Sequence, residues 1–455
     1  MTANKKAIVA GGGLVGALWA IFMAKRGYDV EVFEQRSDMR IAGYSGGRSI
    51  NLAMSERGWK AVRKAGIEDK IRKVAIPMYG RMIHSLSGEL TFQPYGETGQ
   101  AIYSVSRGGL NLELLRIADR FENVKFHFDH KCRGVDLDNN IAAFEHIPTG
   151  DRIQMQAPLI FGTDGAFSAV RNSMLKRPRF NYSQSFLDYG YKELTIPATD
   201  DGRHAMPNLN ALHIWPRHNF MLIALPNADG SFTCTLFLPF EGGEDAFDHL
   251  NTDDEVMRFF ERNFPDAIPL MPTLLEDFHH NPTSALVTVR CTPWEVAGRT
   301  LLLGDAAHAI VPFFGQGMNA GFEDCTILDE MADHYGEDWG RILPEFSSSR
   351  AADANAIADL ALNNFVEMRD LVADPDFLLR KQITAHLHEK YPDQFIPMYT
   401  MVSFSHVPYS RALAEGKAQD VLFDRILAID DIADSWEDNP SVDAIFHAWR
   451  KEFPN

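Results

Sequence analysis

Cysteine is scarce in this 455-residue sequence. The four that occur, Cys132, Cys234, Cys291 and Cys325, lie far apart, and no Cys-x-x-Cys pair is present. This pattern argues against a disulfide framework or a zinc site, and it fits reduced thiols in a cytosolic protein. For histidine pairs such as His127 and His130 we expect no flanking cysteine or carboxylate to complete a ligand set, so we predict no metal site.

Positive charge is also in short supply. The chain has 44 Lys and Arg residues against 62 Asp and Glu residues, which gives a formal net charge of -18. Such a chain repels the phosphate backbone of nucleic acids and the surface of anionic membranes. We therefore expect no nucleic acid among its partners, and no membrane surface.

An uninterrupted hydrophobic run is missing as well. Residues 7–24 are uncharged and have basic residues on both sides, as in a signal peptide or a short membrane anchor. However, glycines stand at positions 11, 12, 13 and 16, where they would weaken a continuous membrane helix. A strand, a tight turn and a buried helix explain the same residues better. We predict a cytoplasmic protein without a membrane anchor, built from two or three domains.

The first 34 residues have the pattern of a dinucleotide-binding unit. A short β-prone run over 6–10 precedes a glycine-rich turn, 14–26 has the length of a helix that ends before Gly27, and 28–34 alternates like a strand. The turn is Gly11-x-Gly13-x-x-Gly16. In such a unit the glycines allow the turn, the approach of backbone to a pyrophosphate, and close packing of helix on strand.

Glu34, at the end of the second predicted strand, is placed to accept hydrogen bonds from an adenosine ribose. A glycine-rich turn alone is a weak signal, but the flanking strand, helix and acidic residue make it a specific one. The unit predicts binding of an ADP moiety and leaves open whether that moiety belongs to NAD or to FAD.

Two later strand ends carry an aspartate. Residues 159–161 lead into Gly162-Thr163-Asp164-Gly165, and residues 300–303 lead into Gly304-Asp305, which is followed by a helix that opens near Gly317. Together with the first unit they indicate one long ligand held at several points, as a flavin dinucleotide requires. We expect its second phosphate near Asp305 and its isoalloxazine at the N-terminus of the helix that begins near Met318-Asn319.

These three motifs, in this order, resemble those of the single-component FAD-dependent aromatic hydroxylases of the para-hydroxybenzoate hydroxylase type. The second motif spans Gly162 to Arg171 and the third spans Gly304 to Asn319. The resemblance implies an α/β fold, in which a Rossmann-type βαβ FAD domain is joined to an antiparallel β substrate domain and a C-terminal helical region. It also implies that Arg107 grips the phosphate or ribityl region of the flavin.

Several stretches are more specific than that family. They resemble the kynurenine 3-monooxygenases within it, and they are Gly47–Gly58, Tyr79–Gly96, Tyr189–Leu194, Asn210–Pro216, Asn363–Met368 and Phe395–Ser405. This resemblance implies hydroxylation of L-kynurenine to 3-hydroxy-L-kynurenine with NADPH and O2, through a C4a-hydroperoxyflavin, in tryptophan degradation and NAD biosynthesis. The flavin performs the chemistry, so no side chain is assigned as catalytic.

The resemblance also implies which residues bind the ligands. The substrate-binding set is Arg81, Tyr95, Asn364 and Tyr399. The cofactor-binding set for FAD is Gly11, Gly13, Val15, Gly16, Glu34, Gln35, Arg36, Ser37, Ala53, Arg107, Cys132, Asp305, Gly317, Met318 and Asn319.

The chemistry of kynurenine supports the assignment of Arg81. The α-carboxylate of this zwitterionic amino acid is matched by a planar, bidentate guanidinium. Arg81 lies among apolar residues in Tyr79-Gly80-Arg81-Met82-Ile83, and a charge buried on a strand implies a partner. The alternative is an arginine that reaches the surface.

The motifs also predict the domain division. The FAD-binding domain is discontinuous and takes residues 1–75, 97–180 and 285–345; the substrate-side sheet takes 76–96 and 181–284; the helical region takes 346–455 and closes the active site. Two other functions stay open from the sequence alone. One is hydroxylation of a phenol or quinone precursor, and the other is a flavoprotein of the same fold that does not hydroxylate.

Overall fold

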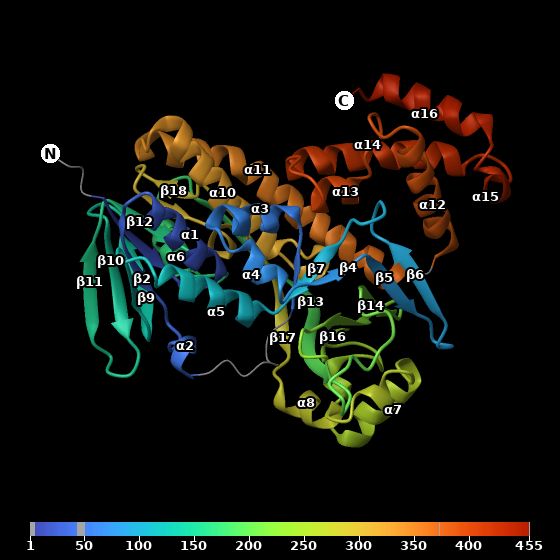
Figure 1. Ribbon diagram of the computed structural model, residues 1–455, viewed down its shortest axis with the longest axis horizontal. Helices are drawn as coiled ribbons and strands as arrows, with labels where there is room; N and C mark the ends of the chain where they lie inside the picture. Colours follow the sequence, from blue (N-terminus) through green and yellow to red (C-terminus); the bar gives the residue numbers. More distant parts are fainter. Residues whose placement is uncertain (1–4, 43–50, 373, 455) are drawn as a thin grey trace.

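A six-stranded sheet forms the nucleotide-binding lobe of the computed structural model, which describes residues 5–42, 51–372 and 374–454 (Figure 1). Its strand order is β18-β19-β12-β1-β2-β8, and every pair except β18–β19 is parallel. The strands are β1 (Lys6–Ala10), β2 (Asp29–Phe33), β8 (Val124–His127), β12 (Leu159–Gly162), β18 (Glu295–Val296) and β19 (Thr300–Leu302). Part of the Gly47–Gly58 stretch lies outside the described residues.

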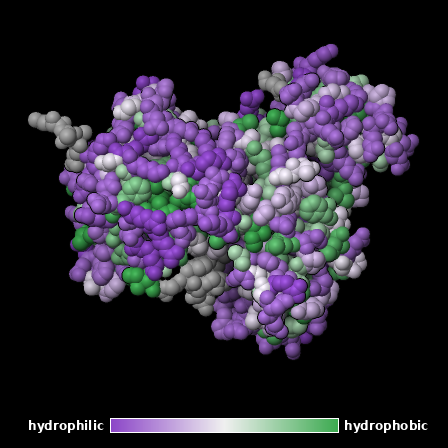
Figure 2. Space-filling model, in the orientation of Figure 1, coloured by the Kyte–Doolittle hydropathy of each residue, from purple (hydrophilic) through white to green (hydrophobic). Residues whose placement is uncertain are grey.

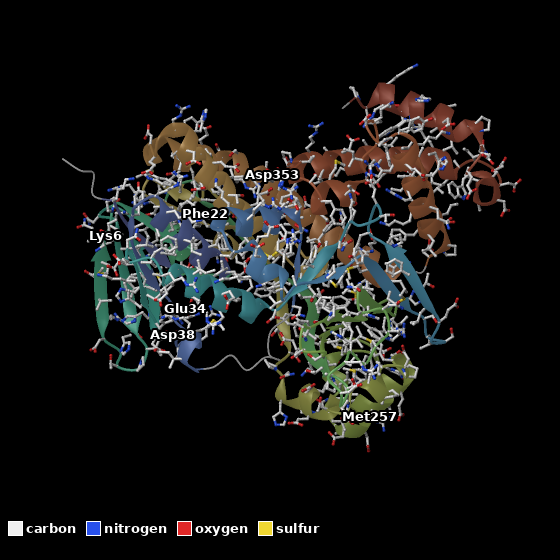
Figure 3. The ribbon with its side chains drawn as sticks, viewed as in Figure 1. Lys6, Phe22, Glu34, Asp38, Met257 and Asp353 are labelled. Carbon is white, nitrogen blue, oxygen red and sulfur yellow. The ribbon has the colours of Figure 1, made fainter. Side chains whose placement is uncertain are left out.

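The predicted βαβ unit is confirmed. Helix α1 (Leu14–Lys25) follows β1 and is buried from Gly16 to Ala24, because α5 (Arg107–Ala118) and α10 (Gly317–Tyr335) pack against it. A helix that is covered on all sides has little amphipathic character, which explains the apolar run in the sequence. Glu34 lies at the end of this unit in Figure 3.

A seven-stranded sheet forms the second lobe, with the order β17-β13-β16-β15-β14-β5-β6. All its pairs are antiparallel except β5–β14, which is parallel. The strands are β5 (Gly80–His84), β6 (Leu90–Pro94), β13 (Asn181–Ile196), β14 (Ala211–Pro216), β15 (Met221–Pro226), β16 (Phe232–Pro239) and β17 (Ser284–Thr292). Because β17 pairs along β13, this sheet extends past residue 285, where we placed the boundary of the FAD domain.

The two faces of this sheet pack against different partners. On one face, residues such as Trp215 and Leu236 form a core with Phe259 and Phe260 of α7 (Asp253–Asn263) and with α8 (Leu274–His280). On the other face, Ile214 and other apolar residues pack toward the nucleotide-binding lobe and the C-terminal helices. The alternation of side chains along a strand produces this division.

The C-terminal region is helical, as predicted, although its first helix begins at Trp339. The helices are α11 (Trp339–Val366), α12 (Pro375–Lys390), α13 (Met398–Ser403), α14 (Tyr409–Leu427), α15 (Ile432–Ser435) and α16 (Pro440–Glu452). A π-helical turn at Glu367–Leu371 extends α11. In Figure 1, α11 leaves the nucleotide-binding lobe and leads to the helices drawn in red.

Shorter elements complete the fold. Two three-stranded sheets have the orders β11-β10-β9 and β3-β7-β4. Their strands are β3 (Leu52–Met54), β4 (Ile76–Met78), β7 (Ile102–Val105), β9 (His130–Asp136), β10 (Ile141–His146) and β11 (Arg152–Gln156). The remaining α-helices are α2 (Met39–Ala42), α3 (Glu56–Ala65), α4 (Glu68–Arg72), α6 (Ala169–Met174) and α9 (Asp305–His308).

Hydrophilic residues cover most of the face shown in Figure 2. Across the described ranges, which omit 1–4, 43–50, 373 and 455, we find no helix whose length and apolar content would let it cross a membrane. The four cysteines are free and buried.

A buried histidine pair joins two strands of the seven-stranded sheet. His84 Nε2 lies 2.9 Å from His213 Nδ1, and His84 Nδ1 lies 2.9 Å from the carboxylate of Asp266. Trp215 also donates a hydrogen bond to this carboxylate at 2.8 Å. Burial, together with the nearby His84, lowers the pKa of His213 to about 4, so its ring is neutral at pH 7.

We expect His213 to make the fold sensitive to acid. Its pKa is lower in the folded state, so the unfolded chain binds the extra proton first as the pH falls below about 6.5. From pH 7 to pH 5 this linkage removes about 2 kcal/mol of folding free energy. In a His213→Gln variant, urea unfolding should depend less on pH over this interval by about that amount. An equal loss in both proteins would contradict this role for His213.

Candidate functional site

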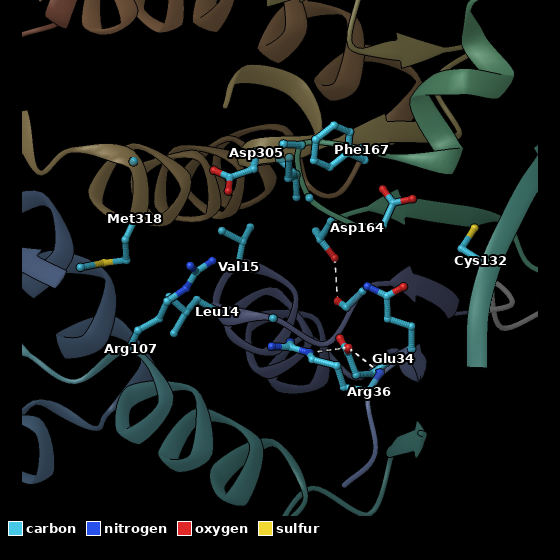
Figure 4. A pocket seen from close by; sticks show the side chains of 18 of the residues that line it. Leu14, Val15, Glu34, Arg36, Arg107, Cys132, Asp164, Phe167, Asp305 and Met318 are labelled. Carbon is cyan, nitrogen blue, oxygen red and sulfur yellow. Dashed lines mark hydrogen bonds and ion pairs between the residues drawn. The ribbon is translucent and has the colours of Figure 1, made fainter. Parts of the chain in front are cut away.

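A cavity of about 690 Å³ lies at the carboxyl ends of β1, β2 and β12, where ligands bind in open α/β sheets (Figure 4). It extends from Glu34 and Arg36 past the glycine turn to Ile310, Gly315 and Met318. A site of this length fits a dinucleotide better than a mononucleotide.

The glycine turn leaves no room for side chains at two positions. Gly11 has φ +106°, and a Cβ atom there would lie 2.4 Å from the carbonyl oxygen of Thr163. A Cβ atom at Gly16 would lie 1.9 Å from the carbonyl oxygen of Gly11. Gly16 therefore serves the packing of α1 on the strands, and it does not line the cavity.

Glu34 joins the turn to the second strand. Its buried carboxylate accepts hydrogen bonds from Gly12 N at 2.8 Å and from Arg36 N and Nε at 2.9 and 2.8 Å. A carboxylate offers about four lone-pair positions, so it retains capacity for ribose hydroxyls. The geometry fits the role that we predict for Glu34.

Arg107 and Asp305 project into the middle of the cavity from different elements (Figure 4). Arg107 is the first residue of α5, and Asp305 is the first residue of α9. Both are exposed, and neither forms an ion pair with another residue in the described part of the chain. A cation and helix N-termini at this point favour the phosphates of a dinucleotide.

The far end of the cavity is held by Asn319. Its side-chain amide donates hydrogen bonds to the carbonyl oxygens of Ala53 and Gly315, both at 2.8 Å, and its Oδ1 accepts one from Ser55 N at 3.0 Å. Asn319 is fully buried. It thus fixes two backbone segments that line the cavity beside Met318, where we expect the isoalloxazine.

Most of the predicted cofactor residues line this cavity. The exceptions are Gly16, Asn319 and Ser37, whose hydroxyl donates to Asp129 instead. Cys132 lies at the adenosine end, and burial raises the pKa of its thiol to about 12, so it stays neutral. That these residues line the cavity is observed, whereas the contact of each one with FAD remains a prediction.

The structure adds Asp164 and Asn51 to the cavity wall. One carboxylate oxygen of Asp164 accepts from Ala169 N at 2.7 Å and so caps α6, while the other has no hydrogen-bond partner among the described residues. Burial raises the pKa of this carboxyl group. The position of Asp164 at a strand end indicates in the sequence that it could line the cavity. No feature of the sequence indicates this for Asn51.

A second polar centre surrounds Arg81, which is 5% exposed on β5. Its NH1 donates to Glu367 at 2.7 Å, and its NH2 lies 3.5 Å from Asn364 Oδ1. Its Nε has no hydrogen-bond partner within the described ranges. The partner that a buried arginine requires is therefore Glu367, which the sequence did not reveal, and one edge of the guanidinium remains open.

Charge dominates this centre. Burial alone would favour a neutral Glu367, but Lys381 and Arg81 lower the pKa of Glu367 to about 2. Burial likewise opposes the charge on Arg81, yet the Glu367 carboxylate raises the pKa of Arg81 further above its ordinary value. Both groups are ionised at pH 7.

Tyr95 and Tyr399 stack beside Arg81. Their rings are 5.2 Å apart and nearly parallel, and each ring centroid lies 5.8 Å from the guanidinium carbon. Burial raises the pKa of Tyr95 to about 12 and that of Tyr399 well above its ordinary value. Both hydroxyls therefore keep their protons, and that of Tyr95 has no hydrogen-bond partner of good geometry among the described residues.

Asn364 links the two centres. Its amide nitrogen donates to the carbonyl oxygen of Phe313 at 2.6 Å, in the 3-10 turn Pro312–Phe314 that precedes α10. Tyr399 stacks on Phe314 of the same turn, with ring centroids 5.3 Å apart. The four predicted substrate residues thus come together, next to the isoalloxazine end of the cavity.

Comparison with known proteins agrees with this geometry. Residues 4–361 match the family described as FAD binding domain. The kynurenine 3-monooxygenase of Christiangramia forsetii is 48% identical over 99% of this chain and 100% of its own length. That of Sus scrofa is 47% identical over 89% of this chain and 85% of its own length.

Solved structures share the fold at low sequence identity. The tetrameric form of 2-methyl-3-hydroxypyridine-5-carboxylic acid oxygenase has a TM-score of 0.66 at 19% identity, over 84% of this chain and 97% of that one. P. putida p-nitrophenol 4-monooxygenase PnpA has a TM-score of 0.64 at 19% identity, over 83% and 92%. With an FAD-binding domain over most of its length and near-complete alignment to these relatives, the chain belongs to the kynurenine 3-monooxygenase family of FAD-dependent aromatic hydroxylases.

Proposed function

We propose that this chain hydroxylates L-kynurenine to 3-hydroxy-L-kynurenine, with NADPH as electron donor and O2 as oxygen source. The observation that carries the proposal is the ion pair between the buried Arg81 and the half-buried Glu367 beside the cofactor cavity, because opposite charges so placed complement a zwitterion. A simple phenol has neither a carboxylate nor an ammonium group for such a pair to bind. Membership of the family supports the same substrate.

The amino-acid end of the substrate binds at the second polar centre. Its carboxylate takes the open Nε edge of Arg81, where a bidentate contact is available, and the Tyr95 hydroxyl donates to it. Its ammonium group faces Glu367, whose low pKa keeps the charge in place. Asn364 contacts both the Arg81 guanidinium and the carbonyl oxygen of Phe313, so it fixes the position of Arg81 relative to the Pro312–Phe314 turn.

The aromatic ring lies against the inner face of the seven-stranded sheet. Leu212, Ile214 and Phe237 belong to one apolar cluster with Phe313, and Phe237 and Phe313 have ring centroids 4.9 Å apart. When bound and reduced, FAD supplies the activated oxygen. The chain positions the ring, and α13 covers the site and excludes water. The amino group of the substrate already activates the ring, so no general base is required.

Product analysis tests the proposal. The purified FAD-loaded protein is incubated with kynurenine, NADPH and O2, and product is identified by its mass while NADPH oxidation is followed. We expect nearly one molecule of hydroxylated product for each molecule of NADPH that is oxidised. Turnover of phenols without kynurenine would favour the first alternative function, and NADPH oxidation without any hydroxylated product would favour the second.

We also propose a cytoplasmic location. Four free, buried cysteines support a reducing compartment, since thiols persist there without pairing.

Arg81 and Arg107 should serve different ligands. Arg81→Ala removes a charge-assisted contact in a buried site, a loss of about 2–5 kcal/mol, so kynurenine should bind roughly thirty-fold to several thousand-fold more weakly. FAD content should stay near normal. Arg107→Ala should lose FAD and change kynurenine affinity less. Titration of each variant with kynurenine, followed by flavin absorbance, measures both effects.

An analogue without the carboxylate is the control for Arg81. It should bind to the wild-type protein and to Arg81→Ala with similar affinity, because neither complex contains the ion pair. Undiminished binding of kynurenine to Arg81→Ala would show that the carboxylate binds elsewhere.

Asp305 should contribute to FAD retention. Its exposed carboxylate lines the middle of the cavity and accepts no hydrogen bond from the described residues, so we expect it to accept one from the ribityl chain. Asp305→Ala should weaken FAD binding by about ten-fold to a hundred-fold, the value of a hydrogen bond to a charged group. Asp305→Asn, which keeps an acceptor, should lose less. Equal FAD affinity in all three proteins would remove Asp305 from the site.

A further inference from the structure

Strand β16 places the hydroxyl of Thr235 on the face of the seven-stranded sheet where we propose that the substrate binds. Cys234 and Leu236 face the core that contains α7 and α8. Phe237 belongs to the opposite face, where it packs on Phe313. Because side chains alternate along a strand, Thr235 lies on the same face as Phe237.

The neighbours of Thr235 place it between the two ligand sites. Thr233, two residues earlier, accepts a hydrogen bond from Asn227 at 3.1 Å, and Asn227 accepts one from Asn51 of the cofactor cavity wall at 2.6 Å. Phe237, two residues later, packs on the turn that Asn364 joins to the Arg81 site. Along β16, Thr235 therefore lies between a residue that is linked to the wall of the cofactor cavity and a residue that packs on the turn beside the Arg81 site.

The Thr235 hydroxyl has no partner there. The residue is fully buried, and Oγ1 makes no hydrogen bond to any described residue. Its cross-strand neighbours are Ile223 on β15 and Glu193 on β13, and Phe237, two residues along β16, belongs to the apolar cluster on this face. A buried hydroxyl without a partner is costly, so it indicates a ligand group that completes it.

Kynurenine has a group that needs such a partner. Its ring amino group stands next to the ketone, so one N–H satisfies the ketone oxygen within the molecule. The second N–H points along the ring edge toward the carbon that is hydroxylated. Buried against this face of the sheet, the N–H needs an acceptor.

We propose that Thr235 Oγ1 accepts a hydrogen bond from this second N–H and so orients the ring. This inference rests on the proposed function. The amino group activates the ring carbons ortho and para to itself alike, so electronic effects alone do not select one. A fixed N–H direction presents the ortho carbon to the cofactor and turns the para carbon away. Thr235 is thus a positioning residue that sets regiochemistry.

The variants Thr235→Val and Thr235→Ser test this role in the FAD-loaded protein. Valine keeps the branched shape without the hydroxyl, and serine keeps the hydroxyl. We compare the affinity for kynurenine with that for its analogue that carries hydrogen in place of the ring amino group. Thr235→Val should bind kynurenine about three-fold to ten-fold more weakly, with the analogue unchanged, and Thr235→Ser should resemble the wild-type protein.

Product analysis supplies the second measurement. Thr235→Val should form the isomer hydroxylated para to the amino group, or should oxidise more NADPH per product, whereas Thr235→Ser should not. If Thr235→Val retains too little FAD to measure, Thr235→Ala replaces it in the comparison with serine.

The outcomes separate the two proposals. If wild-type protein binds and hydroxylates kynurenine, and the ratio of the two affinities and the product isomer are the same in Thr235→Val, the role of Thr235 is refuted while the proposed function stands. If wild-type protein does not hydroxylate kynurenine, the proposed function fails and this role fails with it.

Discussion

The structure depends on a buried carboxylate, Asp324 on α10, that no solvent reaches. It accepts hydrogen bonds from Gly304 N at 3.1 Å, from His308 Nε2 at 2.5 Å and from Arg350 Nε and NH2 at 3.1 and 3.0 Å. Burial alone would favour the neutral acid, yet His308 and Arg350 hold the pKa of Asp324 below its ordinary value. A buried charge with this many partners is costly to disturb, so strand end, α9, α10 and α11 keep one arrangement. His308 therefore has a structural role here.

A second arginine extends this network to the C-terminal region. Arg57 pairs with Glu323, which Arg350 also contacts at 3.1 Å, and it donates to the backbone carbonyls of Met401, Val402 and Val407. Two of these carbonyls belong to the last turn of α13, the helix that carries Tyr399, and the third belongs to the loop that follows it. The charges that hold the third glycine-containing motif in place thus also hold α13, so the cofactor cavity and the proposed substrate site share one network of buried ion pairs.

The sequence was sufficient for features that are local. The glycine turn, the strand-end aspartates and the βαβ unit each depend on residues within about thirty positions, so their patterns are visible without a fold. Glu367 was not visible, because it lies 286 positions from Arg81 and meets it only through a π-helical turn. His213, Asp266 and Asn51 are similar, because their partners His84, Trp215 and Asn227 lie far away in the sequence. The predicted third segment of the FAD domain begins at 285, inside β17, because β17 looks like any strand until its pairing with β13 is known.

Several buried polar atoms without partners trace the path of the ligands. Asp164 Oδ1 lies at the cofactor cavity, Arg81 Nε and Tyr95 OH lie at the site that we propose for the amino-acid end, and we place Thr235 Oγ1 between them. A folded chain leaves few buried polar atoms unpaired, since each costs free energy that packing must offset. Where such atoms gather along one surface, the missing partner is a molecule that binds there. An acceptor, a hydroxyl, and then a bidentate cation with a second hydroxyl fit the proposed sequence of a dinucleotide followed by an aromatic amino acid, and a phenol would leave the cation unpaired.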